Sequence, residues 1–229
     1  MFVVCHILQS LDGKITGSFF SSEKTMNAAG KYGQLRSYYG CEATLYGTNT
    51  MAEFIGVNDH YELDEAMEHE DYIIRDVSYT VAVDTKGKLN YNSGKFIRRG
   101  NSSQIIALLT KQVSEKRLSQ LREKGVSYIF AGDKELDPRL AIEKLEKKCG
   151  IGKLMIAGGG YIDWAFLKED LIDEISLVIA PSADALSSTP SLFMKDEEDD
   201  VVKDFELISF EKVTEDALWL RYKVIRGEN

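Results

Sequence analysis

The chain has 229 residues, 44% of them hydrophobic and 28% charged, and no Pro/Gly/Ser-rich linker interrupts it, which predicts one globular domain over residues 1–229. A formal net charge of −9 argues against a nucleic-acid partner, because phosphate backbones select basic surfaces. No apolar run approaches the roughly 20 residues that span a bilayer, so we expect no membrane partner either.

The first predicted element is a buried strand over residues 2–8, a continuous apolar run that contains His6. The run lacks a basic leader and a small-residue cleavage site, so we do not interpret it as a secretory signal. The cysteines are odd in number and widely spaced, which predicts reduced thiols and a cytoplasmic location. They are Cys5, Cys41 and Cys149.

A polar turn over residues 10–15 follows this strand and contains Asp12 and Gly13. Open α/β sheets bind ligands outside the carboxyl ends of their strands, which is where this sequence places the Asp12 carboxylate. An Asp-Gly pair is also a common turn. The sequence therefore leaves two interpretations of Asp12, a ligand-facing carboxylate and a turn residue.

A helix over residues 25–39 and a short strand over residues 43–46 come next. The strand ends at Gly47, and three residues with hydroxyl or amide side chains follow it: Thr48, Asn49 and Thr50. At a helix start such side chains can donate to a phosphate, or they can simply cap the helix. Taken alone, the pattern favours capping.

Residues 52–76 are acidic, and their pattern predicts an irregular segment that carries His60 and His69. These histidines have neither a cysteine pair nor an i, i+4 partner, so we predict no metal site. A strand over residues 79–83 follows and closes in a turn over residues 84–87.

From residue 105 onward, strands and helices alternate regularly, which predicts parallel pairing with right-handed crossovers. Asp137 and Pro138 predict the start of one of these helices, and Gly150 predicts its end. The predicted elements are a strand over 105–109, a helix over 113–124, a strand over 128–131, a helix over 138–149 and a strand over 154–157.

Three consecutive glycines separate the last of these strands from a predicted helix that begins at Tyr161: Gly158, Gly159 and Gly160. Glycines permit positive φ and remove every Cβ that would keep a phosphate at a distance. The N-terminus of the following helix supplies unpaired N–H groups and the positive end of its dipole. The alternative is a tight turn without a ligand, since the spacing is not that of the dinucleotide fingerprint.

The C-terminal part changes character after a strand over residues 175–180, which Pro181 ends. The acidic run at 196–200 predicts a solvated loop. Residues 205–213 and 218–224 alternate between apolar and polar side chains, and a short polar turn joins them. This pattern predicts an antiparallel hairpin and therefore a mixed sheet.

Five motifs occur in an order and at a spacing that resemble the dihydrofolate-reductase-like superfamily. More narrowly, nearly the whole chain is similar to the reductase domain of the bifunctional riboflavin-biosynthesis deaminase/reductase, in a stand-alone form. The motifs are Ser10–Ile15, Gly47-x-x-Thr50-Met51, Gly158–Gly160, Asp173–Ser176 and Ser191–Phe193. The resemblance implies an α/β fold, a doubly wound, mostly parallel sheet with a C-terminal antiparallel hairpin. It also implies a homodimer that binds NADPH and a small-molecule substrate.

The resemblance also implies roles for individual residues. Around the cofactor pyrophosphate it places Gly47, Thr50, Gly158, Gly159 and Gly160. We add Thr48, Asn49 and Tyr161 as further expected cofactor residues. Lys111 is the local cation for the adenosine 2′-phosphate. Ser10 and Asp12 face the substrate, and we expect Asp12 to orient it or to relay a proton through water.

The chain departs from the family pattern at two of its substrate positions. Ala157 stands where the family has an acidic residue, and His6 stands where it usually has a lysine. Two hypotheses follow, an NADPH-dependent reductase of a pyrimidine or pterin-like molecule and an NADP(H)-binding regulatory protein without turnover. The deaminase zinc signature is absent from the sequence, so we expect no deamination.

Overall fold

The computed structural model describes residues 1–58, 61–196, 198 and 200–227. The chain forms two compact units, and His60 lies outside the described residues. The first unit comprises Met1 and residues 42–154, and the second comprises residues 2–41 and 155–229. The second unit is therefore built from both ends of the chain. A single domain over residues 1–229 stays a prediction.

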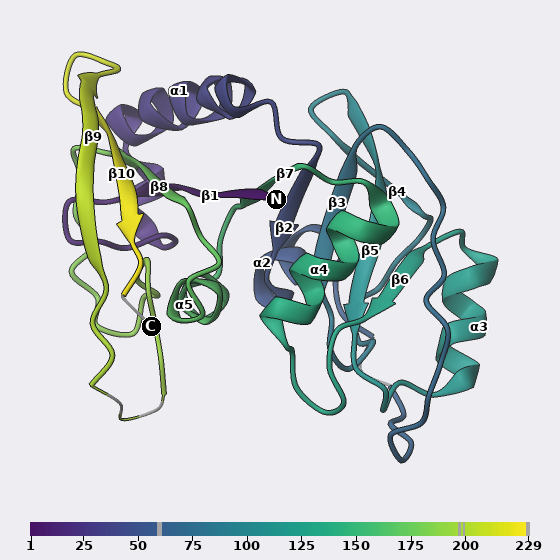
Figure 1. Ribbon diagram of the computed structural model, residues 1–229. Coiled ribbons are helices and arrows are strands. Elements are labelled where there is room, and N and C mark those ends of the chain that lie inside the picture. The colour runs from purple at the N-terminus through teal and green to yellow at the C-terminus, as the bar shows by residue number, and fades with distance from the viewer. Residues whose placement is uncertain (59–60, 197, 199, 228–229) are drawn as a thin grey trace. The chain divides into compact units, whose positions relative to one another are not determined.

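The second unit pairs strands from the two ends of the chain. Its strands are β1 (Phe2–Gln9), β8 (Glu174–Ile179), β9 (Asp204–Lys212) and β10 (Leu218–Ile225). Its helices are η1 (Ser18–Ser21), α1 (Glu23–Tyr39) and α5 (Gly160–Lys168). The β1 and β8 strands are parallel, whereas β10 is antiparallel to both β8 and β9. Helices α1 and α5 cover opposite faces of these strands (Figure 1). The predicted C-terminal hairpin is confirmed.

The first unit is a mixed sheet with its own helices. Its strands are β2 (Ala43–Tyr46), β3 (Tyr79–Val83), β4 (Lys95–Arg98), β5 (Asn101–Leu109) and β6 (Ser127–Phe130). Its helices are α2 (Thr48–Ile55), α3 (Glu115–Glu123) and α4 (Pro138–Cys149). Strands β2, β3, β5 and β6 pair in parallel, and β4 is antiparallel to β5. Strand β7 (Lys153–Ile156) leads from this unit into the second one.

Three elements differ from the sequence prediction, and one of them, the short helix η1, was not predicted. Helix α2 replaces the start of the segment that we expected to be irregular, and β4 was not predicted. Strand β4 is short and mostly exposed, so it lacks the apolar run that identifies a buried strand. The predicted ends of α4 are confirmed, because the Asp137 carboxylate accepts from Leu140 N at 3.0 Å and Gly150 ends the helix with φ of 74°.

Residues 61–76, here called the acidic strap, reach the edge of β6 through residues 71–74. The backbones of Tyr72 and Tyr128 exchange two hydrogen bonds of 3.0 and 2.8 Å. The Ile74 N–H donates to Ser127 Oγ at 2.9 Å, and the Asp71 carboxylate accepts from Phe130 N at 2.8 Å. The strap therefore satisfies the outer hydrogen-bonding groups of an edge strand, which would otherwise be open to another chain.

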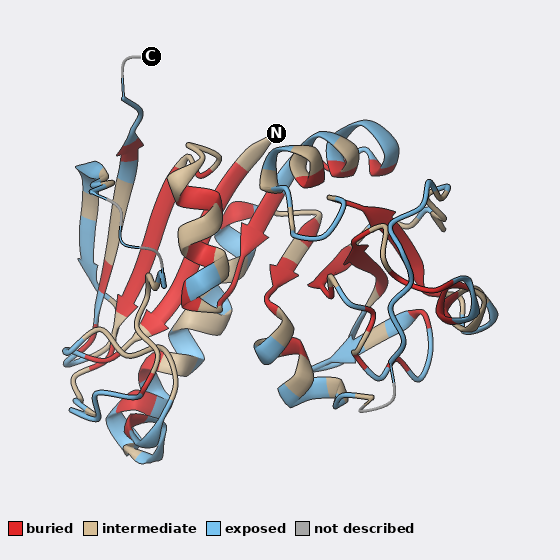
Figure 2. Ribbon diagram, turned by 90° about the horizontal axis from the view of Figure 1, so that it is seen from below, coloured by how far each residue is buried: buried red, intermediate tan, exposed pale blue. Residues whose placement is uncertain are grey.

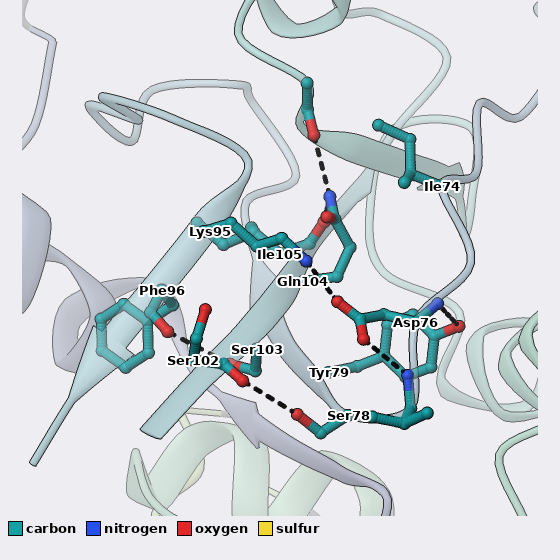
Figure 3. Close-up of polar contacts among 12 residues, drawn as sticks. Ile74, Asp76, Ser78, Tyr79, Lys95, Phe96, Ser102, Ser103, Gln104 and Ile105 are labelled. Atoms are coloured by element: carbon teal, nitrogen blue, oxygen red, sulfur yellow. Dashed lines mark hydrogen bonds and ion pairs between the residues drawn. The ribbon is translucent and has the colours of Figure 1, made fainter. Parts of the chain in front are cut away.

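A polar cluster fixes the amino ends of β3 and β5 (Figure 3). The Asp76 carboxylate accepts from Lys95 Nζ, while the Asp76 N–H donates to the Tyr79 hydroxyl at 2.8 Å. Buried Gln104 donates from Nε2 to Gly125 O at 2.8 Å. Since ligands of parallel sheets bind at the carboxyl ends, this cluster is a scaffold rather than a ligand site.

Burial differs sharply among the strands of the second unit. Strands β1 and β8 are buried along almost their whole length, whereas β9 is exposed at all but one residue (Figure 2). Strand β9 has only β10 as a partner among the described strands. The second unit thus ends in an exposed edge strand.

Candidate functional site

The glycine turn (Gly158–Gly160) connects β7 to α5 in the second unit. Gly158 and Gly159 have φ of 114° and 101°, conformations that other L-residues rarely adopt. Gly159 is the N-cap of α5, and as a glycine it has no side chain to cap this helix. The first-turn N–H groups of such a helix can bind an anion. The backbone therefore has the form that phosphate binding requires, and the cofactor role of the turn stays a prediction.

Packing leaves no room for a side chain at Gly160, and its cofactor role stays a prediction. A Cβ at this position would lie 2.3 Å from Ser191 O and 2.9 Å from Met194 Cγ. The segment around Met194 is held against the turn, because Met194 N donates to Gly160 O at 3.1 Å. The neighbouring Tyr161 hydroxyl donates to Asp196 Oδ1 at 2.7 Å, which places a carboxylate beside this side chain.

The second predicted phosphate site is the start of α2 in the first unit. Gly47 is the N-cap, and as a glycine it has no side chain to cap the helix. The Thr48 hydroxyl instead donates to Val83 O at the end of β3, at 2.6 Å. The interpretation of Thr48, Asn49 and Thr50 as helix caps is therefore wrong. The glycine N-cap leaves the first-turn N–H groups of α2 without a cap from its own side chain, which is compatible with the phosphate interpretation.

Lys111 follows β5, and two carboxylates already neutralise it. Its Nζ lies 2.6 Å from Glu68 Oε1 on the acidic strap and 2.9 Å from Asp133 Oδ1. The hydrogen bonds to Glu68 and Asp133 raise the pKa of Lys111 above its ordinary value. A phosphate at this position would meet both carboxylates. The structure thus gives Lys111 a structural pairing that the sequence did not indicate.

Asp12 is exposed, and backbone groups of the loop after β8 bind its carboxylate. Its Oδ2 accepts from Ala185 N at 2.8 Å, and its Oδ1 accepts from Asp184 N at 3.3 Å and from Ser10 Oγ at 2.5 Å. The Ser10 hydrogen bond is the largest cause that lowers the pKa of Asp12 to about 2. Asp12 is therefore ionised at neutral pH, and Ser10 is a buried partner of the turn.

Asp184, which the sequence analysis did not single out, also connects the loop after β1 with the loop after β8. Its Oδ2 accepts from Ser18 N at 2.7 Å and from Ser18 Oγ at 2.9 Å. Its Oδ1 accepts from Thr189 Oγ1 at 3.0 Å. Asp12 and Asp184 thus join the loop after β1 to the loop after β8 at the carboxyl ends of two parallel strands. No motif in the sequence marks Asp184.

His6 does not face a ligand, because it is fully buried between β1, β8 and α1. Its ring stacks on Tyr32 with centroids 4.4 Å apart, and Nε2 lies 3.0 Å from Tyr32 O. Its Nδ1 lies 2.9 Å from Ser176 Oγ, which accepts from Trp219 Nε1 at 2.8 Å. This chain of contacts assigns the proton to Nε2. Burial lowers the pKa of His6 to about 4.

Asp163, in the first turn of α5, is a buried acidic residue that the sequence analysis missed. Its side chain has no exposed surface, and neither carboxyl oxygen has a hydrogen-bond partner among the described residues. Burial raises its pKa well above the ordinary value, although the nearby Cys5 thiol and Gly158 N–H oppose this. The sequence signal that could have identified Asp163 is its position as an acidic residue inside the apolar run of a short helix.

A second buried acid, Asp84, shapes the turn after β3. Its carboxylate accepts from Lys88 N at 2.8 Å, from Leu89 N at 3.1 Å and from the Tyr91 hydroxyl at 3.1 Å. Burial raises the pKa of Asp84 to about 6. The turn that it fixes carries the exposed side chain of Lys86 at the carboxyl end of β3.

No metal cluster occurs among the residues with described positions. His69, the described member of the predicted histidine pair, stacks on Phe130 with centroids 5.2 Å apart, and its Nδ1 lies 3.7 Å from Glu115 Oε2. Within the same described ranges, no helix has the length and apolarity required to cross a bilayer.

Comparison with known families matches residues 1–218 to the RibD C-terminal domain. A 2,5-diamino-6-ribosylamino-4(3H)-pyrimidinone 5′-phosphate reductase from Methanothermobacter thermautotrophicus is 25% identical over 181 residues, which are 79% of this chain and 77% of that protein. The reductase of the same name from Aquifex aeolicus is 31% identical over 87 residues, only 38% of either chain.

Two solved structures share the fold. A pyrimidine reductase-like protein from Corynebacterium diphtheriae matches with a TM-score of 0.68 and 18% sequence identity. The match covers 99% of this chain and 92% of the Corynebacterium chain. RibD from Acinetobacter baumannii has a TM-score of 0.66 and 20% identity. This chain is covered to 98% by that match but spans only 58% of that RibD chain. The predicted fold class, an α/β fold with a mostly parallel sheet and a C-terminal antiparallel hairpin, is confirmed.

Proposed function

The chain belongs to the RibD C-terminal domain family, and from this premise we propose that it is a nicotinamide-dependent reductase of a ribosylamino-pyrimidine 5′-phosphate. The observation that carries the proposal is the alignment of 181 residues with a reductase of that substrate class. The Corynebacterium protein, of which this chain covers 92%, shares the fold over that length.

We propose NADPH as the cofactor, which supplies a hydride from its nicotinamide ring. The residues fit a phosphate-bearing ligand, because α2 and α5 both begin after a glycine N-cap, which has no side chain of its own beside the first-turn N–H groups. Gly158 and Gly159 present backbone without a Cβ. In this proposal the glycine turn and the first turn of α5 bind cofactor phosphate in the second unit. The start of α2 at Gly47 is a separate candidate phosphate site in the first unit.

The adenosine 2′-phosphate needs a cation that is not already neutralised. Lys111 contacts Glu68 and Asp133, whereas Lys86 has an exposed side chain at the carboxyl end of β3. Strand β3 is adjacent to β2, which ends at Gly47. We therefore assign the 2′-phosphate to Lys86 and expect Lys86→Ala to lower the preference for NADPH over NADH. Lys111→Ala is the matched control and should leave this preference unchanged.

Asp12 is proposed to orient the substrate rather than to supply a proton. A carboxyl group with a pKa of about 2 carries no proton near neutral pH, so it is a poor general acid. Its hydrogen bonds fix the two loops at the carboxyl ends of β1 and β8. Asp12 would then contribute to turnover by keeping these two loops in position.

The test is NADPH oxidation by the purified protein with 2,5-diamino-6-ribosylamino-4(3H)-pyrimidinone 5′-phosphate, together with a direct titration of NADPH binding. Turnover supports the reductase. Binding of NADPH without turnover over a panel of pyrimidines and pterins would favour the regulatory alternative, which Ala157 motivates. The absence of both binding and turnover would refute the proposal.

We further propose a cytoplasmic homodimer. All three cysteines remain thiols, as expected for a reducing compartment. The exposed β9 edge supports the dimer, since open sheet edges tend to be paired or shielded.

A further inference from the structure

Arg117, in the first turn of α3, is a buried cation that donates hydrogen bonds to one neighbouring turn. It is only 8% exposed, and its Nε donates to Gly87 O at 2.8 Å while its Nη2 donates to Leu89 O at 2.6 Å. A buried guanidinium is costly, and a cation in the first turn of a helix also opposes the helix dipole. An apolar side chain would pack α3 without either cost, so the role of Arg117 lies in the turn that it contacts.

The turn that Arg117 contacts covers residues 84–91 and is here called the β3 turn. Arg117 binds carbonyl groups of this turn, whereas the buried Asp84 carboxylate accepts from the N–H groups of Lys88 and Leu89 at 2.8 and 3.1 Å. The Tyr91 hydroxyl donates to the same carboxylate at 3.1 Å. Two buried side chains thus bind both the donors and the acceptors of one short segment, which fixes its backbone.

Gly87 shows how closely the β3 turn packs on Arg117. A Cβ at Gly87 would lie 3.1 Å from Val113 Cγ1 and 3.2 Å from Arg117 Cγ. The Gly87 N–H donates to Asp84 O at 2.8 Å and so closes the part of the turn that carries Lys86. Lys86 itself is exposed, although the glycine beside it is buried. Arg117 therefore packs against the buried part of the turn, while Lys86 remains open to solvent.

The start of α2 lies beside the β3 turn within the first unit. The Thr48 hydroxyl donates at 2.6 Å to the carbonyl oxygen of Val83, the last residue of β3. Strands β2 and β3 are parallel neighbours, so their carboxyl ends lie side by side. The β3 turn therefore places the cation Lys86 at the same strand ends as the candidate phosphate site at Gly47.

We propose that Arg117 is a positioning residue that fixes the β3 turn from its buried side and so holds Lys86 in place for the 2′-phosphate of the cofactor. This inference rests on the proposed assignment of that phosphate to Lys86. A lysine side chain has many rotamers, and a fixed backbone reduces the entropy that is lost when it binds a ligand. Arg117 acts through the turn and does not contact the cofactor.

The experiment compares the affinities for NADPH and NADH, because only NADPH carries the 2′-phosphate. Arg117→Met keeps an apolar stem and removes every donor. Arg122→Met is the matched control in the same helix, since Arg122 contacts Tyr128 and Glu115 rather than the β3 turn. Lys86→Ala and the double variant Lys86→Ala/Arg117→Met complete a double-mutant cycle. Fluorescence titration gives the dissociation constants, and hydrogen exchange follows a peptide covering residues 84–91.

We expect Arg117→Met to lower the preference for NADPH about tenfold, the effect of losing one hydrogen bond to a charged group, while its affinity for NADH stays unchanged. The double variant should lose no more preference than Lys86→Ala alone, because Arg117 acts through Lys86. The β3 turn should exchange faster in Arg117→Met, since two of its carbonyl groups lose their donor. Arg122→Met should match the wild type in each measurement.

Thermal unfolding shows whether each variant folds. If Arg117→Met does not fold, Arg117→Lys replaces it in every comparison, because lysine keeps the charge but lacks the fork of donors that binds two carbonyl groups at once. A loss of preference in the same direction is expected.

An unchanged preference in Arg117→Met, together with a loss in Lys86→Ala, would overturn the inference and leave the proposed phosphate site standing. Equal losses of NADPH and NADH affinity would also overturn it, as would additive losses in the double variant or unchanged exchange of the β3 turn. Equal affinities of the wild-type protein for NADPH and NADH would instead refute the assignment of the 2′-phosphate to Lys86, and the inference would fall with it.

Discussion

The Asp12 carboxylate accepts hydrogen bonds from three groups, and this arrangement predicts the effect of a conservative change. An Asn side chain has one acceptor oxygen, so its NH2 group would face either the Ala185 N–H or the Ser10 hydroxyl. We expect Asp12→Asn to lower turnover by about tenfold or more through displacement of the loop, while NADPH affinity stays unchanged. Single-turnover hydride transfer and cofactor titration measure the two effects.

Ser10→Ala is the matched control for this change, because it removes one of the hydrogen bonds and keeps the carboxylate. Its effect on turnover should be smaller than that of Asp12→Asn. Normal turnover in Asp12→Asn would show that Asp12 is only a turn residue, since Asn adopts the same turn conformations.

His6 predicts a specific loss of stability in acid. Its pKa is about 4 in the folded protein, below the ordinary value of 6.5. Between these values the unfolded chain binds more protons, so the free energy of unfolding falls as the pH drops from 6.5 towards 4. The full effect is about 3 kcal/mol. Its physical cause is burial, which disfavours the protonated, charged form of the imidazole.

His6→Gln is the comparison that isolates this titration, because Asp84 titrates in the opposite sense over part of the same range. The pKa of Asp84 is raised to about 6, so Asp84 adds stability as the pH falls towards 3.8. Denaturant unfolding of both proteins at several pH values is the measurement. We expect the difference in stability between wild type and His6→Gln to shrink in acid. A constant difference would exclude His6 as the group responsible.

At the scale of elements, the glycine turn predicts a separation of folding from cofactor binding. Gly159→Val places a branched side chain at φ of 101°, which costs about 1–3 kcal/mol of strain. It also puts a Cβ on the backbone that we propose contacts phosphate. We expect weaker NADPH binding in a protein that still folds, measured by titration and circular dichroism. Unchanged affinity in the folded variant would leave the turn without a ligand role.

The acidic strap predicts where the first unit is open to aggregation. Tyr72→Pro removes the N–H that donates to Tyr128 O, and so uncovers part of the β6 edge. We expect reduced stability and faster aggregation on mild heating, followed by light scattering. Glu65→Pro, in the same strap but away from β6 among the described contacts, is the control and should aggregate like the wild type.

The regular elements were predictable because each carries a local pattern. The strand over residues 43–46 and the ends of α4 follow from apolar runs and capping residues. Helix α2, β4 and the acidic strap were not predictable in this way, because their stability comes from partners distant in sequence. Tyr72, for example, pairs with Tyr128 across more than fifty residues.

The same distinction applies to the candidate site. The glycine turn could be predicted because glycine alone permits its backbone conformation. The pairing of Lys111 with Glu68 could not be predicted, because it depends on where the strap lies in the tertiary fold. The burial of His6 beneath α1 likewise requires the tertiary fold. The Asp163 carboxyl group was visible in the sequence only as an exception within an apolar helix.

At the scale of the whole molecule, the hairpin presents an apolar face suited to dimerisation. Leu207 lies opposite Tyr222 and Phe210 lies opposite Leu220, so all four share one face. A β-bulge between these pairs keeps Leu207 and Phe210 on the same side although they are three residues apart. Phe210 is 69% exposed and Leu207 is 50% exposed.

We therefore expect a dimer that Phe210→Glu dissociates, because the substitution places a charge on this apolar face. The molar mass in solution, measured over a wide concentration range, is the test. Glu211→Lys alters the charge of the same strand on its opposite face and is the control. A wild-type mass of one chain at every concentration would contradict the dimer.

The discontinuous second unit has a consequence for how the chain matures on the ribosome. The Val3 N–H bonds the Asp173 carboxylate, a partner 170 positions later in the sequence. Strand β1 cannot pair with β8 until the ribosome has passed this point, whereas residues 42–154 of the first unit are synthesised without interruption. We expect residues 42–154 to fold during translation, while the N-terminal strand β1 stays unpaired until β8 has been synthesised. A pause in synthesis after residue 154 would therefore prolong the exposure of β1, the most apolar strand at the beginning of the chain, to chaperones.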